Sequence, residues 1–170
     1  MKFIGAIILI TATSYMGIEY SRKMEERPRQ IRILKNALQI MHAEIIYSHS
    51  SIPLTCFAIS KQISQPLSLF FYNVGQDLEH PTESLYKVWK DNLEKLWDSF
   101  SLINNDKEIL LQFGRSLGKH DVMQQEKHIK LCLSHLERQL EEALDQRNRY
   151  AKMFKSLGFL FGVFLLLLLL

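Results

Sequence analysis

Apolar residues fill both ends of this chain, and charged residues fill its middle. The runs 3–18 and 156–170 contain no ionisable side chain, and Lys2 is the only charged residue outside 19–155. As helices these runs would be about 24 and 22 Å long, against a bilayer hydrocarbon core of about 30 Å. Interfacial and snorkelling residues can cover such a mismatch. The pattern therefore favours two membrane helices joined by one charged domain.

The predicted organisation has three parts. Residues 1–20 form a transmembrane segment, 21–155 a cytosolic domain, and 156–170 a second transmembrane segment. For the first run a cleaved signal peptide is the alternative, because Lys2 precedes the run and Ala12, Thr13 and Ser14 within it form a weak cleavage site. For the second run the alternative is a buried or interfacial helix end. The middle part alone is long enough to bury a core.

Within the domain, apolar residues recur every three to four positions, which is typical of amphipathic helices. Alternating runs rich in Val, Ile and Thr are absent from the sequence of the domain. We therefore predict an all-α bundle of about six helices. Proline, serine, threonine, asparagine and aspartate mark the expected helix starts. These starts lie at Pro28, Ser51, Pro66, Thr82, 104–106 and Asp121.

Two details of these helices are expected from the sequence. Leu54, Phe57 and Ala58 are expected on the buried face of the second helix. Gly114 and Gly118 lie four residues apart, and we favour a packing role within the fold over a partner contact.

The last helix is expected to be unusually long. No proline or glycine interrupts 122–157, and the three-four rhythm continues into the apolar run. This predicts one rigid rod from the domain into the membrane; the alternative is a hinge near Arg147.

Charge is unevenly distributed along the chain. The net charge is +3, yet residues 36–145 hold ten Lys or Arg and fifteen Asp or Glu, a local balance of −5. Basic residues gather beside both apolar runs. By the positive-inside rule the domain is cytosolic and both termini point outward. The acidic body argues against a nucleic-acid-binding protein.

Little in the sequence indicates catalysis. Phosphate-binding glycine loops, HExxH and CxxC motifs are missing from the sequence, so we expect neither an enzyme nor a cofactor. The nearest approach to a metal site is His128, Cys132 and His135, which share one helical face. Packing of a reduced thiol is the favoured explanation, and a metal-dependent regulator is an alternative. Cys56 and Cys132 imply no disulfide framework.

Four blocks of sequence carry a resemblance to a known family. In order, they read MEERPRQIRILKNALQIMHAEIIYS, PLSLFF, KEILLQFGRSLGKHDVMQQEKHIKLCLSHLE and KMFKSLG. The chain resembles, over essentially its whole length, the stage III sporulation protein AB family of endospore-forming bacteria. The region 111–136 is more remotely similar to the cytoplasmic repeat of the type II secretion inner-membrane platform protein.

The resemblance implies a location and a set of partners. The family is an inner-membrane component of the mother cell, and it belongs to a secretion-like complex that links mother cell and forespore. The expected partners are the secretion-type ATPase of the same operon, other membrane subunits of the channel complex, and the lipid membrane. A structural or lipid-sensing anchor without ATPase contact is the alternative function. The surface positions expected to contact a partner are Gln30, Arg32, Arg115, Lys119 and Asp121.

Overall fold

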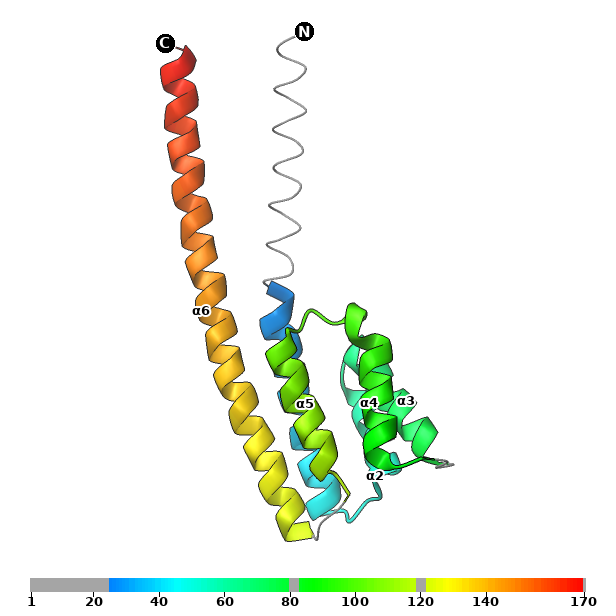
Figure 1. The fold of residues 1–170 in the computed structure, drawn as a ribbon. Helices are drawn as coiled ribbons and strands as arrows, with labels where there is room; N and C mark the ends of the chain where they lie inside the picture. Colours follow the sequence, from blue (N-terminus) through cyan, green and yellow to red (C-terminus); the bar gives the residue numbers. More distant parts are fainter. Residues whose placement is uncertain (1–24, 80–82, 119–121, 170) are drawn as a thin grey trace.

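The fold is that of a computed structural model of the chain. It describes residues 25–79, 83–118 and 122–169, with side chains described as far as Tyr150 and again at Met153. Helices follow one another along these ranges (Figure 1), and the described residues contain no strand. The helices are 25–46, α2 (Ile52–Gln62), α3 (Leu67–Glu79), α4 (Leu85–Leu96), the short 3-10 helix η1 (Trp97–Ser99), α5 (Asn104–Ser116) and α6 (Val122–Leu169). The prediction of an all-α bundle of about six helices is confirmed.

The helix over residues 25–46 lies antiparallel to the first half of α6. His42 Nε2 lies 3.4 Å from Glu126 Oε1, and Lys35 pairs with Glu137. Arg27 Nη2, at the other end of this helix, lies 3.0 Å from Gln139 Oε1. Figure 1 shows α5 beside this pair, with α2, α3 and α4 grouped on its far side.

Trp89 of α4 organises the centre of the core. Its ring is fully buried, and the rings of Phe70 and Phe113 lie 4.9 and 5.7 Å away, centroid to centroid, in edge-to-face contacts. Its indole Nε1 donates a hydrogen bond of 3.0 Å to the carbonyl of Leu110, which satisfies the one polar group of this large side chain. The tryptophan thereby ties α4 to α3 and α5.

Gly114 of α5 provides the space for that indole. A Cβ placed on Gly114 would lie 2.8 Å from Trp89 Cγ, closer than real Cβ contacts. Gly118 has a φ of 75°, a left-handed conformation that L side chains rarely adopt and that commonly ends helices. Both glycines therefore serve packing and chain reversal within the fold, as predicted.

A buried ion pair joins three helices near the start of α5. Arg27 Nε and Nη2 donate to Asp106 Oδ2 and Oδ1 at 3.0 and 3.1 Å, and Asp106 is fully buried. Arg27 also donates to Gln139 of α6. Asp106 Oδ2 additionally accepts from the backbone N–H of Ile103 at 3.0 Å, which caps α5. This cluster, Arg27–Asp106–Gln139, fixes the 25–46 helix, α5 and α6 against one another.

Several helix starts differ from the predicted ones. Residue 25 is already helical, so Pro28 does not begin its helix. The N-cap of α4 is Ser84, whose hydroxyl accepts from Lys87 N, and Thr82 lies outside the described residues. The predicted start of α5 at 104–106 is confirmed, because α5 begins at Asn104 and Asp106 supplies the oxygen that caps the backbone N–H of Ile103.

The predicted buried face of α2 is wrong. Leu54 has an exposed fraction of 61%, and Phe57 and Ala58 are only half-buried. The buried residues of α2 are Thr55, Cys56 and Ile59. Burial of Thr55 and Cys56 turns the helix by roughly one residue relative to the face chosen from hydrophobicity, and Phe57 packs at the edge of the buried face against Tyr72 of α3.

α6 is a single unbroken helix of 48 residues with no hinge near Arg147, so the predicted continuity of the last helix is confirmed. Its entry into a membrane stays a prediction. Among the residues searched, which are those the structure describes, no helix is long and apolar enough to cross a membrane. That result gives no support to the two predicted transmembrane segments. Segment 1–20 lies outside the described residues, as do the side chains of 156–170.

Candidate functional site

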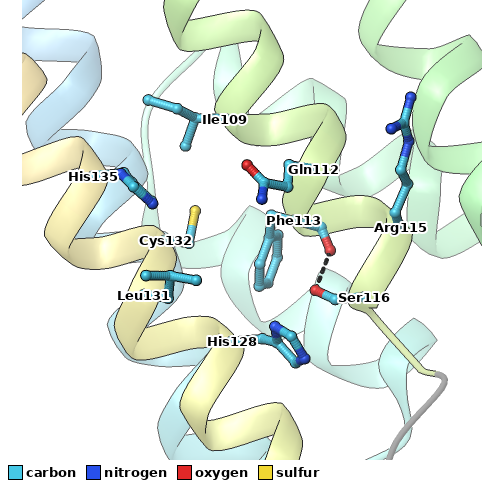
Figure 2. Close-up of a pocket in the computed structure, with 9 residues that line it drawn as sticks. All are labelled: Ile109, Gln112, Phe113, Arg115, Ser116, His128, Leu131, Cys132 and His135. Atoms are coloured by element: carbon cyan, nitrogen blue, oxygen red, sulfur yellow. Dashed lines mark hydrogen bonds between the residues drawn. The ribbon is translucent and has the colours of Figure 1, made fainter.

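A groove of about 320 Å³ runs between α5 and the first half of α6. Figure 2 shows side chains from the two helices facing one another across it. The lining residues are Ile109, Gln112, Phe113, Arg115, Ser116, His128, Leu131, Cys132 and His135. None of these nine lining residues is acidic, which distinguishes the groove from the acidic body around it.

The floor of the groove is apolar. Phe113 and Cys132 are buried at its base, whereas Leu131 presents an exposed fraction of 48% at its edge. Burial raises the pKa of the Cys132 thiol to about 12, because the thiolate would lose its hydration. The thiol therefore stays protonated at neutral pH and contributes apolar surface.

The rim of the groove is polar and in part basic. His128 and His135 flank Cys132 on α6, and Gln112 faces them from α5 (Figure 2). Arg115 leaves α5 on the side away from α6. Its Nε donates to Tyr86 Oη at 3.1 Å, and its guanidinium lies 5.4 Å from the centroid of the Tyr86 ring.

Arg115 is held in place without an ion pair. The hydrogen bond to Tyr86 is the main cause that raises the pKa of Arg115, and the charge of Glu108 acts more weakly in the same direction. In the described part of the chain, no carboxylate forms an ion pair with Arg115. The tyrosine thus fixes an exposed cation at the edge of the groove.

His128, Cys132 and His135 line the groove together but do not form a metal site. Within the described ranges, no group of three or more His, Cys, Asp or Glu residues is placed to hold a metal ion. The metal-dependent alternative receives no support from this geometry.

The predicted contact residues fall into four groups. Gln30 is wrong as a surface position, because it is buried and its Oε1 accepts from Ser101 N at 2.8 Å. Arg32 is exposed on the 25–46 helix but does not line the groove. Arg115 lies at the groove. Lys119 and Asp121 lie outside the described residues.

Three residues of α6 were missed by the sequence analysis. Met123, Lys127 and Leu131 follow one another at four-residue spacing, and all three are exposed. The exposed fraction of Met123 is 79%. These residues, the α6 ridge, run along the helix beside the groove. The sequence did contain a signal for two of them. Met123 and Leu131 are hydrophobic, yet they lie off the seam of Ile129, Leu133 and Leu136 that faces the core.

A second cavity, of about 390 Å³, lies further along α6. It is lined by the η1 region and by Arg27, Gln146 and Arg147. Arg147 and Arg149 are exposed, so the basic residues expected beside the second apolar run do face outward from the bundle.

Comparison with known proteins identifies the family. The sequence profile of the family described as stage III sporulation protein AB matches residues 2–170. A curated relative named "Stage III sporulation protein AB", from Bacillus subtilis (strain 168), is 43% identical over 169 residues, covering 99% of each chain.

A solved structure agrees with that assignment. A stage III sporulation protein AB structure is 42% identical to this chain, with a TM-score of 0.69, and the match covers 73% of this chain and 98% of the solved one. Similarity thus extends over the whole sequence and over the helical fold. The chain belongs to the stage III sporulation protein AB family.

Proposed function

We propose that this protein is a non-enzymatic, membrane-anchored platform subunit of a secretion-like sporulation complex, and that it docks a cytosolic ATPase of the same operon. The observation that carries the proposal is the unbroken α6. One helix runs from the groove at its start to the apolar run 156–170 at its end. A partner bound beside α5 and α6 would therefore be held at a fixed position relative to whatever the far end of α6 is anchored in.

Membrane attachment in this proposal rests on the sequence. The runs 3–18 and 156–170 contain no ionisable side chain, and the exposed Arg147 and Arg149 precede the second run. Cations at this position suit anionic headgroups on the cytosolic side. The described domain would then hang in the cytosol of the mother cell, with both termini outward.

A docking role is supported by the exposed charge and apolar surface at the start of α6. Arg115 is oriented by Tyr86, and Leu131 and Met123 expose apolar area that the bundle does not cover. Such groups set the specificity and the encounter rate of a complex more than its raw affinity. The absence of a catalytic motif in the sequence is consistent with a binding subunit.

The proposal is tested by co-purification. Full-length tagged protein, extracted in detergent from sporulating cells, should capture the ATPase, and the double change Arg115→Glu and Lys119→Glu should reduce the capture at least fivefold. Arg29→Glu is the control charge reversal, because Arg29 is exposed on another helix and, among the residues that the structure describes, pairs with Glu26 alone. Undiminished capture by the double variant would show that this surface is not the ATPase contact. No capture by the wild type would overturn the docking role.

A structural or lipid-sensing anchor is the second candidate function. The cavity beside Arg27 and Arg147, together with the exposed Arg149, favours it. In that case the full-length protein would not bind an ATPase. Extraction of the full-length protein from vesicles would depend on anionic lipid and on salt. Reconstitution into vesicles with and without phosphatidylglycerol distinguishes the two functions.

A further inference from the structure

Three features of the α6 ridge and of the groove beside it bear on what could bind there. The first is exposed apolar area, with Met123 at 79% and Leu131 at 48%. These two residues are separated by two turns of α6, and Leu131 also lines the groove. An apolar side chain of a partner could rest on Leu131 and extend toward the buried Phe113 of the floor.

The second feature is exposed positive charge. Lys127 lies between Met123 and Leu131 on the α6 ridge and is exposed. Of the residues that the structure describes, none forms an ion pair with Lys127 or with Arg115.

The third feature is the state of the nearby carboxylates. Glu126 is already engaged by Lys130 at 2.6 Å and by His42 at 3.4 Å. Glu108 affects Arg115 only through its charge and is not among the lining residues. Among the residues that the structure describes, the groove lining therefore carries the positive charge of Arg115 and no carboxylate.

We infer that this groove and ridge bind a partner segment in which acidic residues flank an apolar side chain. The carboxylates would meet Lys127 and Arg115, and the apolar side chain would cover Leu131. Charge complementarity selects this occupant over a basic or a purely polar segment. Only the identity of the partner that supplies this segment rests on the proposed docking role.

Binding of designed peptides tests the inference directly. The probe is a fluorescein-labelled peptide of about 15 residues with leucine at helical spacing and glutamate elsewhere, titrated by anisotropy against the purified full-length protein. A peptide with lysine in place of every glutamate, and one with serine in place of every leucine, should bind at least tenfold more weakly.

Two charge reversals on one helix locate the binding surface. Lys127→Glu should weaken binding of the acidic peptide about tenfold, whereas Arg138→Glu should leave it unchanged within twofold. Arg138 is exposed on the same helix, lies outside the groove and undergoes the same change in charge. Gln112→Glu adds a negative charge inside the groove, where it can compete for Arg115, and it should also weaken binding.

The outcomes separate this inference from the proposed function. Failure of the acidic peptide to bind, or equal binding by the Lys127→Glu variant, overturns the inference even if ATPase capture depends on Arg115. Peptide binding that follows the expected pattern supports the inference even if the wild type captures no ATPase, in which case only the docking role falls. Displacement of captured ATPase by the acidic peptide supports both.

Discussion

At the scale of single residues, the Arg27–Asp106–Gln139 cluster carries the most consequence for stability. Both charges are buried, and every hydrogen bond of the bidentate pair joins elements far apart in the sequence. A buried ion pair adds little compared with apolar residues, but removal of one partner leaves an uncompensated charge in the interior. Both partners of the pair are therefore needed to hold the three helices in their relative positions.

Asp106→Asn should lower the free energy of unfolding by about 3–5 kcal/mol, because Arg27 would stay buried without its counter-charge. Urea unfolding followed by circular dichroism measures the loss. The matched control is Glu26→Gln, which breaks the exposed pair with Arg29 and should cost less than about 1 kcal/mol. Equal effects of the two changes would contradict the account of the cluster.

Gly114→Ala should destabilise the fold by about 1–3 kcal/mol, because its Cβ would overlap the buried indole of Trp89. Gly75→Ala provides the comparison. Its Cβ would meet Phe57 at 3.0 Å, but Phe57 is half-buried and can shift, and alanine gains about 1 kcal/mol of helix propensity over glycine. Thermal unfolding should therefore show a large fall in Tm for the first variant and little change for the second.

Burial makes both cysteines unreactive. The pKa of Cys56 and of Cys132 is raised to about 12 from 9.0. Neither thiol should react with Ellman's reagent at pH 8 in the native protein, and both should react in urea. Because unfolded thiols ionise first, the unfolded state binds fewer protons above pH 9, and stability should fall as the pH rises from 9 toward 12. Rapid labelling of native Cys132 would show that the groove floor is open.

The type and position of single residues predicted the packing role of Gly114 but not the burial of Gln30 and Asp106. The packing role of Gly114 followed from its size and its place at a helix end. The burial of Gln30 and Asp106 did not follow, because polar residues are usually exposed, and only the approach of Ser101 and Arg27 makes their burial favourable. Those partners are separated by more than 70 positions and have no local signal.

At the scale of elements, helical periodicity was a reliable guide to which segments are helices and a weaker guide to their faces. Long stripes such as that of the 25–46 helix, with Ile31, Leu34 and Leu38, are buried as expected. In the short α2 only a few residues define the face, and Thr55 and Cys56 are buried although Leu54 is more hydrophobic. Packing against α3 decided the outcome there.

The continuity of α6 can be measured with two spin labels. Arg138 and Met153 are both exposed, and an unbroken helix separates their Cα atoms by about 22 Å. Arg138→Cys with Met153→Cys, in the full-length protein, should give one narrow distance distribution consistent with that spacing in a double electron–electron resonance experiment. A broad or shortened distribution would reveal a hinge near Arg147.

At the scale of the whole molecule, one helix connects the groove to the apolar end of the chain. The groove and the α6 ridge lie at the start of α6, and the apolar run follows at its far end. The sequence alone indicated the rod and the two apolar ends, and it pointed to Arg115. The groove itself arises only when α5 packs against α6, so it could not have been inferred from either segment separately.

Site-specific photocrosslinking in sporulating cells tests the docking of the ATPase at this groove most directly. A photoreactive residue in place of Gln112, which lines the groove, should form a covalent product with the ATPase. The same residue in place of Tyr72, an exposed position of α3 outside the groove, should not. A product from position 72 alone, or none from position 112 while the ATPase still co-purifies, would contradict the account.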